Sequence, residues 1–130
     1  MLRSQSNRQI SVASVLPANV LLLKECKIHE ELSRPFQYDL LLYSEDWNID
    51  FNKVLGQPMA IRLDLNLLNT RYFHGMVSRF EQGPPGPEFA PGRRLATYTA
   101  TVVPWLWFLK NRTNCRIFQK KSVPDIVKEI

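Results

Sequence analysis

Histidine is the side chain most often used for proton transfer or metal binding near neutral pH, and this chain has two, His29 and His74. His29 precedes Glu30 and Glu31, so the three could in principle form a metal patch, but their place at the end of an apolar run predicts a solvated turn. His74 lies inside the run Tyr72–Phe80, where it could act as a general base, yet no acid or nucleophile accompanies it locally. We therefore expect His74 to be a structural histidine that bonds to a turn.

Motifs that bind phosphate or metal, or that present a catalytic nucleophile, are absent from the sequence. It contains no Gly-rich phosphate loop, no Cys-x-x-Cys pair, no His-Glu-x-x-His and no Gly-x-Ser-x-Gly. The two cysteines, Cys26 and Cys115, match no metal-ligand spacing, and we expect both to be buried thiols in a reducing compartment. The sequence thus predicts no enzymatic activity, no cofactor, no metal site and no catalytic residue.

Aromatic and basic residues gather near the C-terminal end of the chain. Trp105, Trp107 and Phe108 are flanked by Lys110 and Arg112. Rings beside basic groups can stack on the bases of single-stranded nucleic acid. These rings fall in a continuous apolar run, however, which is more typical of a core or an interface. We favour that interpretation and keep a basic β-barrel that binds nucleic acid as the alternative function.

Alternation of apolar and polar residues, which marks a strand with one buried face, dominates the middle of the chain. The clearest case is Ile61, Leu63, Leu65 and Leu67, whose side chains should all face one core. The expected strands are Val20–Ile28, Phe36–Leu42, Ile61–Leu67, Tyr72–Phe80 and Leu95–Val103, the first two as a hairpin or adjacent pair.

Glycine, proline and asparagine indicate where these strands turn, bend or stop. Asn69-Thr70 is expected to be a turn, and Gly75 predicts a bulge or a bend at a barrel corner. Residues 83–92 hold four prolines and three glycines, which should prevent any strand ladder. Asp50–Leu55 is expected to be a short helix that ends at Gly56, with Asn48 or Asp50 as its N-cap.

The C-terminal segment differs in character from the strands. Trp105–Leu109 is apolar on all sides and predicts a helix that is largely covered by the sheet or by a neighbouring chain. Ser122 and Asp125 resemble a capping box before a second helix. The apolar stripe of that helix, which includes Ile126 and Ile130, stops where the chain stops.

The order of these elements predicts a mainly β protein with short helices (α+β), in which antiparallel strands curl into a barrel. Residues 1–19 are expected to be a flexible or edge-pairing N-terminal arm, residues 20–103 the barrel, and residues 104–130 a helical segment that leads into a missing downstream domain. The net charge is +5 overall, and residues 104–130 carry six basic against two acidic side chains. No stretch resembles a membrane span or the apolar part of a secretory signal.

Five short stretches follow one another along residues 20–130 in an order typical of one protein family. They are Leu32–Leu40 (LSRPFQYDL) followed by Ser44-Glu45-Asp46, Leu55–Pro58 (LGQP), Arg71–Val77 (RYFHGMV), Tyr98–Leu109 with its PWLW, and Arg116–Val127, which begins RIFQ. Together they resemble the VgrG family of type VI secretion spike proteins, in the region similar to phage tail hubs. No single stretch is specific, but five in order are.

The resemblance implies a structural part with the antiparallel β-barrel of the phage tail hub type. In that family, three chains form a pseudo-sixfold base that docks on the hexameric Hcp tube and carries a puncturing needle and effectors. Effectors and baseplate proteins are therefore further candidate partners. The spike is assembled in the cytoplasm and then secreted through the type VI machine without a signal peptide.

The chain departs from the family in its extent. It holds roughly one barrel and the first helices after it, and no needle, so we expect the isolated chain to be a monomer or weak dimer although the full-length parent is a trimer. No catalytic residue carries over from the resemblance, and neither a membrane span nor nucleic acid is expected.

Overall fold

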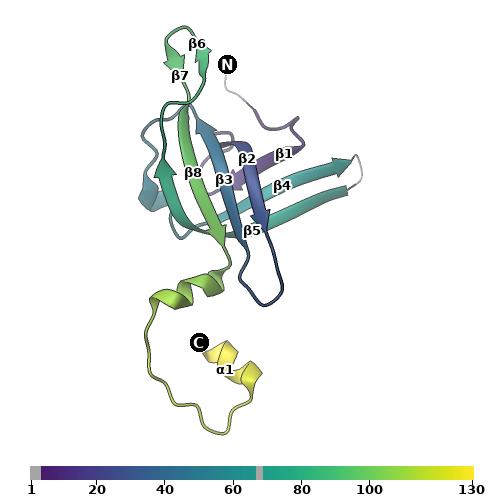
Figure 1. Cartoon of the computed structure of the whole chain (residues 1–130), viewed down its shortest axis with the longest axis vertical. Coiled ribbons are helices and arrows are strands. Elements are labelled where there is room, and N and C mark those ends of the chain that lie inside the picture. The colour runs from purple at the N-terminus through teal and green to yellow at the C-terminus, as the bar shows by residue number, and fades with distance from the viewer. Residues whose placement is uncertain (1–3, 67–68) are drawn as a thin grey trace.

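A computed structural model describes residues 4–66 and 69–130 of the chain. Within these ranges six strands form one antiparallel sheet in the order β1-β4-β5-β8-β3-β2, and two short strands form a separate hairpin, β6-β7 (Figure 1). The expected mainly β, antiparallel architecture with short helices is confirmed. The strands of the large sheet are β1 (Ile10–Ser14), β2 (Leu22–His29), β3 (Gln37–Ser44), β4 (Pro58–Asn66), β5 (Asn69–Gln82) and β8 (Ala96–Val103).

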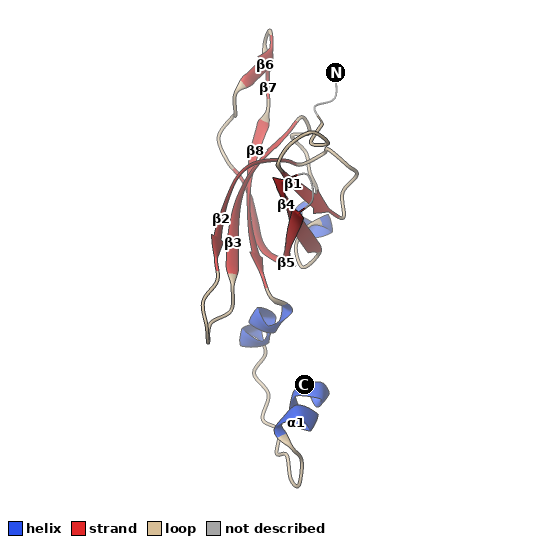
Figure 2. Cartoon of the chain, turned by 90° about the vertical axis from the view of Figure 1, so that its right-hand side faces the viewer, coloured by secondary structure: helices blue, strands red, loops and turns tan. Residues whose placement is uncertain are grey.

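The large sheet is curled, so that its two halves face each other. Figure 2 shows β2, β3 and β8 on one side and β1 and β4 on the other. The long strand β5 joins the halves because its first part pairs with β4 and its second part with β8. The apolar side chains enclosed by this curl form the core, and the largest fully buried ones are Tyr98, Leu23, Leu42, Met59, Ile61 and Leu95.

The expected pairing of the first two predicted strands is confirmed. β2 and β3 run antiparallel, with Cys26 opposite Leu40 and Ile28 opposite Tyr38. Tyr38, Leu40 and Leu42 are all buried, as alternation requires of a strand with one face in the core. On its other edge β3 pairs with β8, so it lies in the interior of the sheet.

β1 lies inside the segment expected as an N-terminal arm, and it extends the sheet beyond β4. Its five residues pair antiparallel with β4, from Ile10 opposite Leu63 to Ser14 opposite Met59. Val12 reaches the core, where only 9% of it is exposed. The proposed division of the chain at residues 19/20 and 103/104 stays a prediction.

The change of partner along β5 requires a glycine. A Cβ atom at Gly75 would lie 2.6 Å from the carbonyl oxygen of Val103 and 2.9 Å from Cγ1 of Val102. The register shift that marks a bulge lies beyond Gly75, between Val77 and Arg79. Gly75 thus permits the close approach of two strands, whereas the bulge after it adds the local twist.

The alternation along β4 is confirmed at its start and fails toward its end. Met59 and Ile61 are 2% and 1% exposed, and Leu63 packs partly buried against the core. Leu65 is 59% exposed, so its expected place in the core is wrong. The register slips between Asp64 and Asn66, and the hairpin end extends past the facing strands (Figure 1). Leu67 lies outside the described residues.

The turn expected at Asn69-Thr70 is wrong, because both residues belong to β5. Asn69 lies opposite Asn66 and Thr70 opposite Asp64 in the ladder with β4. The hydroxyl of Thr70 also donates a hydrogen bond to Oδ1 of Asp64 at 2.9 Å. Short polar side chains here bond across the ladder, although in sequence they are the ones that most often indicate turns.

The short helix expected after residue 48 is confirmed as a 3-10 helix, η1 (Phe51–Lys53). Its N-cap is Asp50, whose Oδ1 accepts a hydrogen bond from the backbone N–H of Asn52 at 3.0 Å. Gly56 has a φ of +71°, the left-handed conformation expected after the helix. The helix is shorter than the predicted Asp50–Leu55 because a single capped turn completes it.

The expectation that residues 83–92 hold no ladder is wrong. β6 (Glu88–Ala90) and β7 (Arg93–Arg94) pair in a small hairpin. Gly92, with a φ of +70°, supplies the left-handed residue that the turn needs. The prolines at 84, 85 and 87 precede the hairpin, and Pro91 lies in its turn, so none has to donate to the ladder.

The predicted helix at Trp105–Leu109 exists but is neither α-helical nor buried. It is the 3-10 helix η2 (Trp105–Asn111), and none of its residues, all of them described, is buried. Trp105 is 59% and Leu106 is 51% exposed. η2 contacts β5, and Figure 1 shows it beyond the lower end of the sheet, where no strand lies over it. An apolar run alone does not distinguish a core helix from one left open.

The last element is α1 (Val123–Glu129), which follows an extended stretch and lies away from the sheet (Figure 1). Ser122 occupies the expected N-cap position but makes no side-chain cap hydrogen bond, because its hydroxyl bonds to the carboxylate of Asp125. Of the apolar stripe, Ile130 is 54% exposed and Ile126 is only partly covered.

The expectation that both thiols are buried is wrong for Cys115 and holds only in part for Cys26. Cys26 is partly buried and Cys115 is exposed in the extended stretch before α1. Burial, followed by the charge of Glu25, raises the pKa of the Cys26 thiol. None of the helices in the described ranges has the length and apolar character needed to cross a membrane.

Candidate functional site

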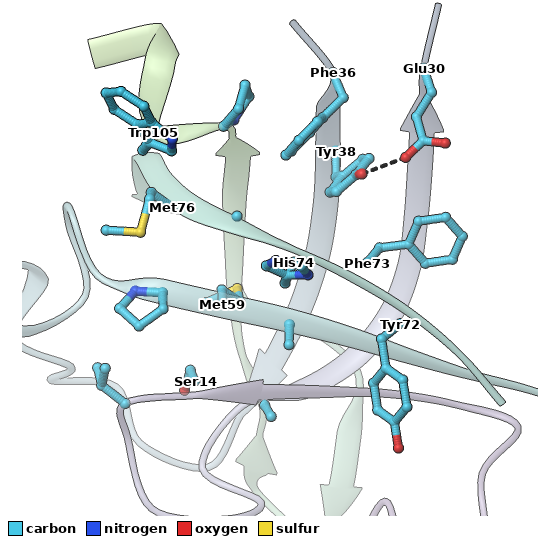
Figure 3. Close-up of a pocket in the computed structure, with 16 residues that line it drawn as sticks. Ser14, Glu30, Phe36, Tyr38, Met59, Tyr72, Phe73, His74, Met76 and Trp105 are labelled. Carbon is cyan, nitrogen blue, oxygen red and sulfur yellow. Dashed lines mark hydrogen bonds between the residues drawn. The ribbon is translucent and has the colours of Figure 1, made fainter. Parts of the chain in front are cut away.

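A large hollow lies where the two halves of the curled sheet come together, near the end of β8. It has a volume of about 630 Å³ and is lined mainly by apolar side chains from β1, β3, β4 and β5. Trp105 and Met76 lie on one side of it, and Tyr72 and Phe73 on the other (Figure 3). We call this feature the apolar hollow.

One wall of the apolar hollow is a group of aromatic rings. Phe36 and Tyr38 stack with their centroids 4.5 Å apart, and Tyr38 meets Phe73 edge-on at 5.7 Å. Tyr38 and Phe73 alternate with polar neighbours along β3 and β5, so the strand period directs both rings to the same side. The guanidinium of Arg71 lies over the ring of Phe73, 4.5 Å from its centroid.

A small polar network borders this wall. The hydroxyl of Tyr38 donates a hydrogen bond to Oε1 of Glu30 at 2.6 Å (Figure 3), and Nη2 of Arg71 lies 3.5 Å from Oε2 of the same carboxylate. Burial, followed by the hydrogen bond to Glu30, raises the pKa of Tyr38. The phenol is therefore a neutral donor near neutral pH, which fixes the carboxylate at the edge of the hollow.

The two histidines lie in different surroundings. His29 is exposed at the end of β2, with its Nε2 3.4 Å from Oε1 of Glu31, and Glu31 also pairs with Arg34 at 3.3 Å. His74 is exposed and lines the apolar hollow together with Ser14, yet within the described ranges no hydrogen bond joins the two. The expected bond from His74 to a turn is likewise not found in those ranges.

Side chains that could bind a metal ion do not gather in the described part of the chain. No group of three or more His, Cys, Asp or Glu side chains there is arranged to hold a metal ion. The apolar hollow instead has the composition of a surface that accepts apolar side chains, and Glu30, which pairs with Arg71, is a polar group in its lining.

Several aromatic and basic side chains of the C-terminal segment contact one another. Trp107 and Phe108 meet edge-on at 5.4 Å, and Nζ of Lys110 lies 5.3 Å from the centroid of Trp107. Lys121 likewise lies over Phe118 and pairs with Glu129. These basic groups therefore already have acidic or aromatic partners inside the segment.

Sequence patterns did not single out the Tyr38–Glu30–Arg71 network. Glu30 lies 8 positions from Tyr38 and 41 positions from Arg71 in the sequence. Each of the three fits an ordinary strand or turn position. The available signal was the position of Tyr38, a phenol on the buried face of a predicted strand, since a buried tyrosine hydroxyl requires a partner.

Comparison with known proteins places this fold in a family. The model of the phage tail baseplate hub (GPD) family matches residues 29–130. The VgrG1b and VgrG1c proteins of Pseudomonas aeruginosa, both type VI secretion system spike proteins, are 40% and 41% identical over the whole chain. The chain spans 17% of the length of each of these two relatives.

A solved structure shows the same architecture. The E. coli c3393 protein, described as a component of the type VI secretion system with structural similarity to the T4 bacteriophage tail proteins gp27 and gp5, matches with a TM-score of 0.61. The two chains are 25% identical, and the match covers 82% of this chain and 31% of the other. The resemblance to VgrG spike proteins is thereby confirmed, and the chain belongs to the phage tail baseplate hub (GPD) family.

Proposed function

We propose that the chain is a structural hub module of a type VI secretion spike, part of a trimeric base that docks on the Hcp tube and carries the puncturing needle and effectors. Similarity to type VI secretion spike proteins along 97–100% of the chain supports this assignment. The matched region covers 17% of the length of VgrG1b, so most of that spike protein lies outside it.

The structural observation that carries the proposal is the concentration of uncovered apolar surface at one end of the sheet. The apolar hollow opens there, and Trp105 and Leu106 lie beside the strand end with more than half of their surface exposed. Exposed apolar patches of this kind mark protein contacts. A module that functions by fitting against other domains needs such a surface, whereas an enzyme needs a convergent set of reactive groups.

The proposed module has no enzymatic role. It acts in the cytoplasm during assembly and leaves the cell as part of the spike, through the type VI machine. In this proposal residues 20–103 form the hub barrel, residues 1–19 a flexible or edge-pairing arm, and residues 104–130 a helical segment that leads into a downstream domain. Effectors and baseplate proteins are candidate partners of the whole spike.

Sedimentation velocity with Hcp hexamers tests the docking step. The chain is mixed with preassembled Hcp rings at a series of concentrations, and Hcp alone and the chain alone serve as references. We expect a new boundary that sediments faster than the Hcp ring and grows with chain concentration. Separate boundaries for ring and chain at every concentration would contradict docking through this module.

The alternative, a nucleic-acid-binding barrel, is supported by the six basic residues of the 104–130 segment and by the rings beside them. The observation against it is that Lys110 and Lys121 already lie over rings of the same segment. Titration of a labelled single-stranded oligonucleotide at increasing salt separates the two. Binding that weakens steeply with salt would favour the alternative, because phosphate contacts release counterions.

A further inference from the structure

The curled sheet has two edge strands, and they face each other across a seam. β1 pairs only with β4 and β2 only with β3 in the order of the sheet, so each leaves one edge without a strand partner. The two edges are close enough to be in contact, yet no ladder joins them. Backbone N–H and C=O groups along a buried seam must find other hydrogen-bond partners.

The side chain of Gln5 supplies these partners. It is only 6% exposed, in a segment where most neighbouring side chains face solvent. Its Oε1 accepts hydrogen bonds from the backbone N–H of Val12 on β1 and of Leu23 on β2, both at 3.0 Å. Its Nε2 donates to the carbonyl oxygens of Val12 at 3.2 Å and of Leu21 at 2.8 Å.

The amide of Gln5 is thereby fully satisfied, since a glutamine side chain offers two donor hydrogens and an oxygen that accepts two bonds. Two of its four bonds go to β1 and two to the chain at the start of β2, so one side chain spans the seam. A ladder of backbone hydrogen bonds between β1 and β2 could satisfy the same groups, but these two strands do not pair in the sheet.

Neighbouring residues hold Gln5 in place. Its backbone N–H donates to Oδ1 of Asn19 at 3.0 Å, and Nη1 of Arg8 donates to the carbonyl oxygen of Leu23 at 3.1 Å. The carbonyl oxygen of Gln9 accepts from the N–H of Asp64 at 2.7 Å, which ties the other end of the segment to β4. Residues 4–9 therefore contact both halves of the curl.

We propose that Gln5 is the latch that closes the curled sheet, and that residues 4–9 form a clasp across the seam between β1 and β2. This inference goes beyond the hub function and does not depend on it. When the latch is released, the backbone groups of Val12 and Leu23 lose their partners and the seam opens locally. The clasp thus determines whether two strand edges are covered or free to pair with another chain.

Amide hydrogen exchange, followed residue by residue, tests the latch. Gln5→Leu removes all four hydrogen bonds at similar volume, and Gln5→Asn retains the amide on a side chain too short to span the seam. Gln9→Ala is the matched control, because the Gln9 side chain is exposed and its backbone bond to Asp64 is kept. Amides of the central strand β8 report on the rest of the sheet.

We expect the amides of Val12 and Leu23 to exchange at least about tenfold faster in Gln5→Leu than in the unaltered protein. In Gln5→Asn the same amides should exchange faster by a smaller factor. The exchange rates of the β8 amides, and all rates in Gln9→Ala, should not change. If Gln5→Leu does not fold, the same comparison is made with Gln5→Asn. Exchange at Val12 and Leu23 that matches the unaltered protein, or an equal acceleration at every strand, would overturn the proposal.

Discussion

Gly75 is the residue at which the strand that joins the two halves of the sheet passes the end of β8. The missing side chain leaves room for the carbonyl oxygen of Val103, which would lie 2.6 Å from a Cβ atom there, and for the ring of Phe36 at 3.1 Å. Its φ is not in the left-handed region, so the requirement is space rather than backbone conformation. The same close approach places Met76 and Trp105 beside one another at the apolar hollow (Figure 3).

Gly75→Ala is therefore expected to lower the free energy of unfolding by about 1–3 kcal/mol, the usual cost of inserting a methyl group into packed structure. Gly83→Ala is the matched control, because the nearest atom to a Cβ there is 3.6 Å away, an ordinary contact. Urea unfolding of the two variants gives the comparison. Equal stabilities for both would show that the strands near Gly75 relax without cost.

The Tyr38–Glu30 pair predicts a stability change at alkaline pH. Burial and the bond to Glu30 raise the pKa of Tyr38 in the folded state above its ordinary value of 10.0. Above about pH 10 the unfolded chain therefore releases the proton of Tyr38 more readily than the folded chain, and stability falls as pH rises. Below pH 10 the contribution of the neutral phenol is fully present.

Urea unfolding at pH 8 and pH 11 measures this effect. Tyr38→Phe should lose less stability between the two values than the unaltered protein does, because it has no phenol proton to release at that site. Tyr72 is 64% exposed, so Tyr72→Phe should behave as the unaltered protein does. The expectation is contradicted if Tyr38→Phe and Tyr72→Phe lose the same stability.

At the scale of elements, β4 combines a covered part and an uncovered part in one strand. Ile61 is 1% exposed and Leu65 is 59% exposed, although both belong to one alternating pattern. Truncation should separate them: Ile61→Ala is expected to cost about 2–5 kcal/mol, as large-to-small core changes do, and Leu65→Ala less than about 0.5 kcal/mol. Thermal or urea unfolding of both variants measures the difference, and similar costs would mean that Leu65 is covered in solution.

Strands could be predicted from the sequence because alternation follows directly from the two faces of a sheet. β2, β3, β5 and β8 all lie close to their predicted ranges, and Asp50 and Gly56 delimit η1 as capping chemistry requires. Where alternation failed, at Leu65, the cause was a local register slip and the end of the facing layer. Neither the register slip nor the end of the facing layer can be recognised from the alternation of apolar and polar residues.

Features that depend on distant partners could not be predicted in the same way. The apolar run of η2 fits a buried helix equally well, and only its position beyond the sheet leaves it open. Gln5 lies in a polar segment that predicts a loose arm, yet its partners Val12 and Leu23 are 7 and 18 positions away. The apolar hollow likewise arises from four strands that meet only after the sheet curls.

At the scale of the whole molecule, a well-packed curled sheet is combined with a sparsely packed C-terminal segment. Buried residues are frequent up to Val103, whereas none lies in η2 or α1. The segment also carries a net positive charge, and its exposed apolar side chains include Ile117, Val123, Val127 and Ile130. Exposed apolar surface of this kind marks a site of contact with other proteins.

An exchange of segments tests the proposed hub function most directly. In the VgrG1b protein of Pseudomonas aeruginosa, the 130-residue region that is 40% identical to this chain is replaced by this chain, and the chimaera is expressed in cells that lack their own VgrG1b. The variant Gly75→Ala of the same chimaera serves as a reference for a weakened fold.

The readout is the amount of Hcp and of chimaera released into the medium by the type VI machine. The hub function predicts that the chimaera is released together with Hcp and that the Gly75→Ala form is released in smaller amounts. A chimaera that accumulates as a folded trimer in the cytoplasm, with no release of Hcp, would contradict the assignment of this chain as a hub module.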